Sequence, residues 1–239
     1  MKKTFGDSPL YLLMFFFLFA FSAIATLILS PSVLNAQQLT AADNGNSGAP
    51  VTGKSPFETL KKTYANIFSL EASFHQKVFV SGIRRIREFE GDFFFKRQKG
   101  FLWKYRKPKV KIFLFDGRYM WQDEEEKAFV LKNSISREKT GGTFFDLIED
   151  IERIDDLFTV AEHSMTGGAE YFELIPKKDS SVTLAKLWVD TKSLLRKIEI
   201  TEFTGNINTI EFSDIRVNTP VSDTKFIFRA DGTKDVIER

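Results

Sequence analysis

The sequence lacks cysteine altogether among its 239 residues. This absence excludes disulfide bonds, thiolate metal sites, a cysteine nucleophile and a lipid attached to a cysteine side chain. Histidine is nearly absent as well, since His75 and His163 are the only two. The usual hydrolytic and metal-binding sites therefore have few candidate residues.

An excess of one charge is also missing, because 34 lysines and arginines face 32 aspartates and glutamates. A polybasic nucleic-acid surface is therefore not expected. Phenylalanine is the residue in excess, with 26 copies. The length permits one large domain or two small ones, but no internal repeat and no shift in composition divides the chain.

The N-terminus has the pattern of an export signal. Lys2 and Lys3 precede an apolar run over 10–29, and Pro31 is followed by a cleavage-like Leu-Asn-Ala at 34–36. We interpret 1–36 as a signal peptide. An uncleaved anchor is the alternative, because the run is about as long as a bilayer core requires. Both interpretations export the rest of the chain.

A polar segment separates this signal from the folded part. Residues 37–54 are small and polar, which predicts a disordered leader. The folded domain is then 55–239. Its first element is a predicted amphipathic helix, with Ser55 as N-cap and Glu58 completing a capping box. Its apolar stripe comprises Phe57, Leu60, Tyr64, Ile67 and Phe68.

After Leu70 the apolar period changes from helical to alternating, which is typical of half-buried antiparallel strands. Turn signals separate the strand-like segments. We expect strands near 72–80, 85–95, 101–106, 110–115, 118–122, 127–132, 157–162, 170–175, 182–189, 194–203, 207–216 and 225–228.

A second helical pattern interrupts the strands. Thr143 is a plausible N-cap, and an apolar stripe with helical spacing follows it, made of Phe144, Phe145, Ile148 and Ile151. The fold class predicted from these elements is mainly β with an α lid. We expect an incomplete, open antiparallel β-barrel of about 11 strands, covered by amphipathic helices.

Aromatic residues are densest over 89–103, across two predicted strands and the basic turn between them. Three interpretations fit this stretch: a packed core, a stacking platform for single-stranded nucleic acid, and a wall of a cavity for an apolar ligand. Export and near-neutral charge oppose the second. The alternation pattern does not separate the first from the third. Phe93 and Phe95 are candidates for the cavity wall.

Two polar features are assigned no chemistry. His75 has no acid at the spacing of a catalytic triad or a metal site, so we expect a surface or hydrogen-bonded histidine. The four acids 123–126 lie in one hairpin turn and cannot all face one ion, so we expect a solvated turn. No metal, no cofactor and no catalytic residue is predicted.

Short motifs occur in a characteristic order along the chain. They are Ser69–Val78, Gly91-Asp92, Lys96-Arg97, Phe101-Leu102-Trp103, Pro108, Asp116–Trp121, Phe172–Pro176, Thr204-Gly205-Asn206, Phe212-Ser213, Asn218, Phe226-Ile227-Phe228 and Asp235-Val236-Ile237. Together they resemble the LolA family of periplasmic outer-membrane lipoprotein carriers, over roughly 56–238. The first motif is similar to the Ala-Ser-Phe-x-Gln signature that opens the family's sheet.

The resemblance implies a chaperone that is not an enzyme. Such a carrier holds the acyl chains of triacylated lipoproteins in an open barrel under a helical lid. Its implied partners are an inner-membrane lipoprotein-releasing ABC transporter and an outer-membrane acceptor lipoprotein, with no nucleic acid, and it is expected to be a monomer. The acceptor role itself requires a cysteine, which this chain lacks.

The resemblance also implies roles for single residues. Arg97 matches the arginine that hydrogen-bonds the lid, although the proline that usually follows it is Gln98 here. Phe101 and Trp103 match apolar positions near the cavity, and the stripe of 144–151 matches a lid helix. An exposed turn cation and ordinary core aromatics are the simpler alternatives. A membrane-tethered lipid- or lipoprotein-sensing domain of the same fold is the alternative function, and a lipid or glycan hydrolase is a third, without a nucleophile motif.

Overall fold

The computed structural model describes residues 55–134, 154–177, 182–230 and 232–238. Its strands form one sheet in the order β12-β6-β5-β4-β3-β2-β1-β11-β10-β9-β8-β7. The strands are β1 (Ser69–Val80), β2 (Arg85–Lys96), β3 (Gly100–Lys107), β4 (Lys111–Phe115), β5 (Tyr119–Glu124), β6 (Phe129–Ser134), β7 (Phe158–Thr166), β8 (Ala169–Pro176), β9 (Val182–Val189), β10 (Leu195–Glu202), β11 (Ile207–Val217) and β12 (Asp235–Glu238). The described helices are α2 (Glu58–Ala65) and α4 (Ile154–Leu157).

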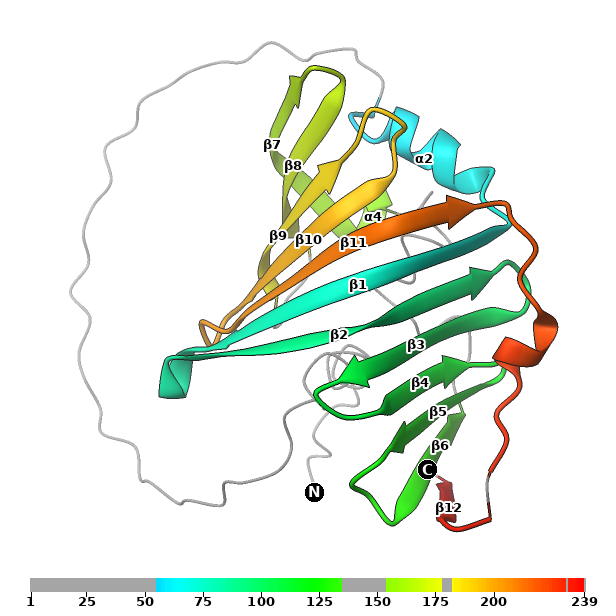
Figure 1. The fold of residues 1–239 in the computed structure, drawn as a ribbon. Helices are drawn as coiled ribbons and strands as arrows, with labels where there is room; N and C mark the ends of the chain where they lie inside the picture. Colours follow the sequence, from blue (N-terminus) through cyan, green and yellow to red (C-terminus); the bar gives the residue numbers. More distant parts are fainter. Residues whose placement is uncertain (1–54, 135–153, 178–181, 231, 239) are drawn as a thin grey trace, which may run out of the picture.

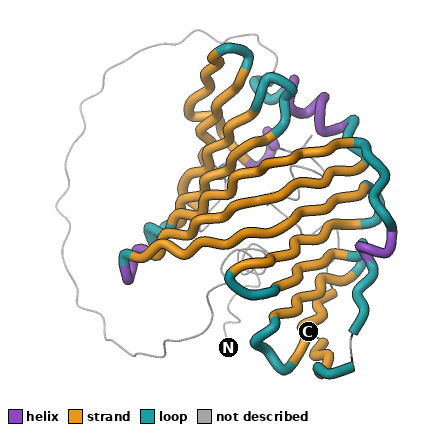
Figure 2. The backbone as a smooth tube through the Cα atoms, in the orientation of Figure 1, coloured by secondary structure: helices purple, strands orange, loops and turns teal. Residues whose placement is uncertain are grey.

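The sheet is curved and open. Its two outermost strands, β12 and β7, are not paired with each other, and Figure 1 shows the strand direction turning steadily from β6 through β1 to β7. This rotation follows from the right-handed twist of each strand. The continuous sheet is also visible in Figure 2. The predicted fold class, a mainly β open sheet with helices, is confirmed.

Alternating side chains give the sheet two different faces. We call the inner face the one that carries Phe93 and Phe95, and the outer face the one that carries Phe94, which lies between them in β2. Paired residues share a face, so Phe93 lies opposite Trp103 and Phe94 opposite Leu102. The run of three phenylalanines therefore contributes to two separate hydrophobic clusters.

The inner cluster draws on helices and on most strands. Its residues are Phe57, Leu60, Tyr64, Ile67, Leu70, Ala72, Phe74, Val78, Phe89, Phe93, Phe95, Phe101, Trp103, Tyr105, Phe113, Phe115, Met120, Ile154, Phe172, Leu174, Ala185, Leu187, Val189, Leu194, Leu195, Ile198, Ile210 and Phe212. The outer cluster is small and consists of Phe94, Leu102, Leu114, Val221 and Phe226.

Helix α2 places its apolar stripe in the inner cluster, as predicted, but two details differ. Phe68 is 62% exposed and does not belong to the stripe. The helix begins after Phe57, whose side chain makes no cap. Ser55 Oγ instead accepts from the N–H of Phe57 at 3.2 Å and donates to Asp155 at 2.8 Å. The predicted capping box is therefore wrong, and the serine links α2 to α4.

The C-terminal segment crosses the outer face. The predicted strand at 225–228 is wrong, because Asp223–Phe226 forms a 3₁₀ turn in which Ser222 accepts the N–H of Thr224. Its apolar residues Phe226 and Phe228 instead pack in and against the outer cluster. The twelfth strand is β12, which pairs with β6 in parallel. The sheet is thus antiparallel except at this edge.

Three expected segments lie outside the described residues. These are the signal peptide 1–36, the leader 37–54, and the helical stripe of Phe144, Phe145, Ile148 and Ile151. The described residues resume at Ile154, which is buried in the inner cluster at the start of α4.

Candidate functional site

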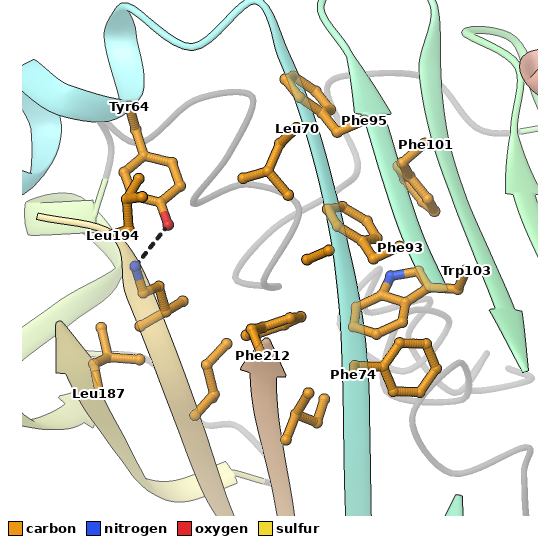
Figure 3. Packing of buried hydrophobic residues seen from close by; sticks show 14 of the residues in the cluster. Tyr64, Leu70, Phe74, Phe93, Phe95, Phe101, Trp103, Leu187, Leu194 and Phe212 are labelled. Carbon is orange, nitrogen blue, oxygen red and sulfur yellow. Dashed lines mark hydrogen bonds between the residues drawn. The ribbon is translucent and has the colours of Figure 1, made fainter. Parts of the chain in front are cut away.

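Aromatic rings line the middle of the inner face, and Figure 3 shows several of them side by side. The ring of Trp103 lies 4.8 Å from that of Phe93 and 4.6 Å from that of Phe74, measured between centroids. The ring of Phe101 lies 5.6 Å from that of Phe115. The structure thus brings the predicted residues Phe93, Phe101 and Trp103 together on one face, and Phe95 joins the same cluster.

A glycine makes this ring arrangement possible. Gly91 lies opposite Phe74 in the pairing of β1 and β2. A Cβ atom at Gly91 would lie 2.6 Å from the ring of Phe74 and 2.3 Å from the carbonyl oxygen of Lys104. The absence of a side chain therefore leaves room for the ring of Phe74 beside β2, where it meets Trp103 edge-to-face.

A chain of polar side chains crosses the inner face beyond these rings. The hydroxyl of Tyr105 donates to Gln76 Oε1 at 2.9 Å, and Gln76 Nε2 donates to Asn208 Oδ1 at 2.9 Å. All three residues are buried. Burial raises the pKa of Tyr105 above its ordinary value, so the hydroxyl stays a donor. These bonds satisfy the polar atoms within an otherwise apolar wall.

Arg97 holds the C-terminal end of α2. It lies in the turn between β2 and β3, and its Nη2 donates to the carbonyl oxygens of Tyr64 at 2.9 Å and of Ile67 at 2.9 Å. Its Nε also donates to the latter at 3.0 Å. The last carbonyls of a helix have no partner in the regular helical pattern, and a guanidinium carries enough donors to bind several of them together. Arg97 is therefore a helix-binding residue rather than an isolated turn cation.

The turn that carries Arg97 has an unusual backbone. Gln98 adopts a φ of 65°, which a proline ring cannot adopt, because it locks φ near −65°. A proline at position 98 is therefore incompatible with this turn conformation. The arginine nevertheless reaches the helix.

Sequence reasoning missed a second residue that holds the same junction. Asn218 Nδ2 donates to the carbonyl of Asn66 at 2.9 Å, while its Oδ1 accepts the N–H of Phe68 at 2.7 Å. Its φ is 57°, a conformation that asparagine tolerates better than most residues. The motif order includes Asn218, but nothing local in the sequence points to a contact 150 residues away.

Two contacts fix the remainder of α2 to the inner face. The Tyr64 hydroxyl accepts the N–H of Leu195 at 3.0 Å, as Figure 3 shows, and burial raises the pKa of Tyr64. At the other end, Lys61 Nζ lies 2.6 Å from Asp155 Oδ2 in α4. Burial alone would raise the pKa of Asp155, but hydrogen bonds from Lys61 and Ser55 lower it overall. The helix is thus attached near both of its ends.

The acidic turn after β5 is not solvated as expected. Glu124 is only 5% exposed and lies 3.1 Å from Lys111 Nζ; it also pairs with Lys127 and accepts Gln122 Nε2 at 2.7 Å. Burial would raise the pKa of Glu124, but the bonds from Lys127, Lys111 and Gln122 lower it overall. Its neighbours have separate partners, such as Lys234 for Asp123. The prediction of a solvated turn is wrong for Glu124.

His75, to which the sequence assigns no chemistry, has an acidic partner in the structure. Nε2 of His75 lies 3.1 Å from Glu88 Oε2 at the surface, as a hydrogen-bonded histidine should. Within residues 55–134, 154–177, 182–230 and 232–238, no group of three metal-ligating side chains occurs. No helix in these ranges is long and apolar enough to cross a membrane. What the inner face offers is a wide aromatic surface.

Comparisons with known proteins match this geometry. A family model described as "Outer membrane lipoprotein carrier protein LolA" matches residues 65–229. The outer-membrane lipoprotein carrier protein of Nitrosomonas europaea is 26% identical over 190 residues, covering 79% of this chain and 92% of that protein. The protein of the same description from Methylobacillus flagellatus is 23% identical, covering 75% and 87%. An uncharacterized conserved protein from Thermus thermophilus shares the fold with a TM-score of 0.51 at 7% identity, covering 77% and 97%.

Proposed function

The chain belongs to the LolA family of outer membrane lipoprotein carrier proteins, and from this premise we propose that it carries lipoproteins by binding their acyl chains on the inner face of its sheet. The observation that carries the proposal is the row of buried aromatics Phe93, Phe95, Phe101 and Trp103 on that one face. The chain acts as a chaperone and not as an enzyme.

The physical need for such a carrier follows from the cost of exposing acyl chains. Each methylene removed from an apolar environment costs about 0.8 kcal/mol. A triacylated lipoprotein therefore leaves a membrane only when another apolar surface accepts its chains. Flat aromatic faces accept chains of varied length and saturation because dispersion contacts are not directional.

We infer that α2 and the segment 144–151 form the lid over this surface. Arg97 would act as its latch, since from the turn between β2 and β3 it binds the carbonyl of Tyr64 in the last turn of α2 and that of Ile67 just beyond the helix. The latch uses hydrogen bonds at one end of the helix, which can break without disturbing the strands. Phe144, Phe145, Ile148 and Ile151 would contact the acyl chains from the lid side.

The proposed route runs through the periplasm. An inner-membrane lipoprotein-releasing ABC transporter would supply the cargo, and an outer-membrane acceptor lipoprotein would receive it. The carrier itself is proposed to be a monomer, exported by residues 1–36.

The direct test is a release assay. Membranes that hold a triacylated lipoprotein and the purified releasing transporter are incubated with ATP and the protein, and the supernatant is analysed for a soluble complex. We expect a complex of one carrier with one lipoprotein. Failure of the wild-type protein to bring any lipoprotein into solution contradicts the carrier function.

A pair of arginine and lysine variants tests the latch in the same assay. Arg97→Leu should still take up cargo but transfer it to acceptor-containing membranes several-fold more slowly, because the empty closed state is no longer favoured. Lys104→Leu is the matched control, since Lys104 is an exposed cation on the neighbouring strand. Equal transfer by the two variants contradicts the latch role.

The tethered sensor remains the second candidate, because the apolar run over 10–29 is long enough to anchor the chain. A tethered protein cannot shuttle between two membranes. N-terminal sequencing of the exported protein separates the two functions: a start near Gln37 supports the shuttle, and retention of 10–29 supports the tether.

A further inference from the structure

Two hairpin turns at one end of the sheet form a surface that the carrier function does not use. Ser81 Oγ, in the turn between β1 and β2, donates to the carbonyl of Thr204 at 2.6 Å, and Asn206 Oδ1 accepts the N–H of Ser81 at 3.1 Å. Figure 1 shows these two turns side by side at the left end of the sheet. Because β2 runs from this end to the turn of Arg97, the two features lie at opposite ends of the strands.

Large apolar side chains are exposed on both turns. Phe203 is 71% exposed, Ile86 61% and Ile83 55%. On the outer face of the strands, Phe79 lies directly opposite both Ile86 and Ile207 in the sheet register. We call these five residues the tip patch. Phe79 and Ile207 are half-buried and support the three exposed side chains. Exposed apolar side chains gathered at one point of a surface are typical of interaction sites, membranes among them.

The charges around the tip patch are positive. Arg84 and Arg85 are exposed and form no ion pair with any described residue, and Arg87 follows in β2. The nearest acid in that strand, Glu88, already pairs with His75 and Lys77. Glu202, on the neighbouring turn, accepts hydrogen bonds from Thr204 and Asn206. Arg84 and Arg85 therefore present unneutralised charge beside exposed apolar groups.

The geometry points to this tip as a contact with an anionic phospholipid surface. Apolar side chains enter a membrane interface by about 5–10 Å, while neighbouring cations bind the headgroups. Ile83 ends the 3₁₀ turn between β1 and β2, and Ile86 is the second residue of β2. A tip-first approach thus brings Ile83, Ile86 and Phe203 into the interface and leaves the arginines at headgroup depth. The contact is independent of acyl-chain binding on the inner face.

The test uses the absence of cysteine, because a single introduced cysteine then carries an environment-sensitive fluorophore. Full-length Ile83→Cys and Phe203→Cys are labelled and mixed with vesicles of phosphatidylethanolamine and phosphatidylglycerol. Lys192→Cys is the control, in the exposed turn between β9 and β10 at the other end of β10. A label at each site reports its own surroundings, so insertion of 10–29 does not imitate insertion of the tip.

We expect a blue shift at positions 83 and 203 and none at 192. With Arg84→Asn and Arg85→Gln added, the vesicle concentration that gives half of the blue shift should rise about 25-fold, at roughly fivefold for each arginine. Asparagine suits position 84, where φ is 49°. Absence of a shift at 83 and 203, a similar shift at 192, or an equal response to purely zwitterionic vesicles overturns the proposal. If the tip patch binds a protein instead of a membrane, vesicles cause no shift at 83 and 203, which is the first of these outcomes.

Discussion

The two faces of the sheet bury apolar residues in different ways. On the outer face a short C-terminal segment of the same chain completes a small cluster, and it is held there by the pairing of β12 with β6 and by ion pairs from Lys96 and Lys99 to Asp223. On the inner face, helix α2 covers part of the inner cluster, and we call it the cover. It contacts Arg97 and Asn218 at one end and Asp155 near the other.

The difference shows that burial alone does not distinguish a core from a binding surface. Phe93 and Phe94 are both buried and adjacent in sequence. Phe94 nevertheless packs with Val221 and Phe226 of the C-terminal segment, whereas Phe93 belongs to the inner cluster, which α2 joins. A cover fixed near its ends can move as a unit. For this reason we assign the acyl-chain surface to the inner face and a structural role to the outer face.

The largest expected effect is on stability and separates the two faces directly. Phe93→Ala should lower the free energy of unfolding by about 4 kcal/mol, because its side chain is fully buried among other rings. Phe94→Ala should cost about 2 kcal/mol, because it lies at the margin of a small cluster, under Lys225. Urea unfolding of both variants measures this. Equal losses would contradict the comparison.

An intermediate effect is expected at Glu124, which lies on the inner face near the C-terminal segment. Glu124→Gln should lower the free energy of unfolding at pH 7 by about 2 kcal/mol, through lost charge-assisted bonds. The pKa of Glu124 is lowered in the folded protein, so its stabilisation is complete above about pH 4.3 and is lost as the pH falls through the folded value.

Urea midpoints between pH 7 and 3 check this prediction. The wild type should lose more stability over the acid part of this range than the variant. Glu125→Gln is the control, because within the described part of the chain the Glu125 carboxylate accepts only the exposed backbone N–H of Val110. Parallel pH profiles for wild type and Glu124→Gln would show that the buried carboxylate is not the titrating group.

The smallest effect is expected at the contact between α2 and α4. Asp155→Asn should cost less than about 1 kcal/mol, since this ion pair is partly exposed. Hydrogen exchange of the α2 amides should nevertheless become several-fold faster, because the start of the cover is released. Asp156→Asn, an exposed neighbour, is the control. Unchanged exchange in α2 would mean that Asp155 does not hold the cover.

Much of the sheet could be predicted from the sequence, because alternation records burial on one face. The alternation predicted β1 correctly, since Ala72, Phe74 and Gln76 all face inward. It failed after β11, since Phe226 and Phe228 alternate like a strand but follow a 3₁₀ turn onto the outer face. The four residues of β12 are exposed, so they carry no burial pattern to detect.

The site was less accessible to sequence reasoning. The aromatic positions were found because their residue types are unusual, and Arg97 was found through a family motif. The partners of Arg97 and Asn218 are backbone carbonyls and amides far away in sequence, which no side-chain pattern encodes. Glu124 shows a missed signal, because Met120, Gln122 and Glu124 alternate on the buried face of β5.

The central claim is that acyl chains lie on the inner face, and the three phenylalanines of β2 test it most directly. A photoreactive phenylalanine analogue placed at 93, 94 or 95 keeps the residue type and changes only the face. On illumination of the loaded carrier, we predict cross-links to the lipoprotein from 93 and 95, and from 94 only cross-links within the chain. Cross-linking of cargo from 94 and not from 93 or 95 would contradict the account.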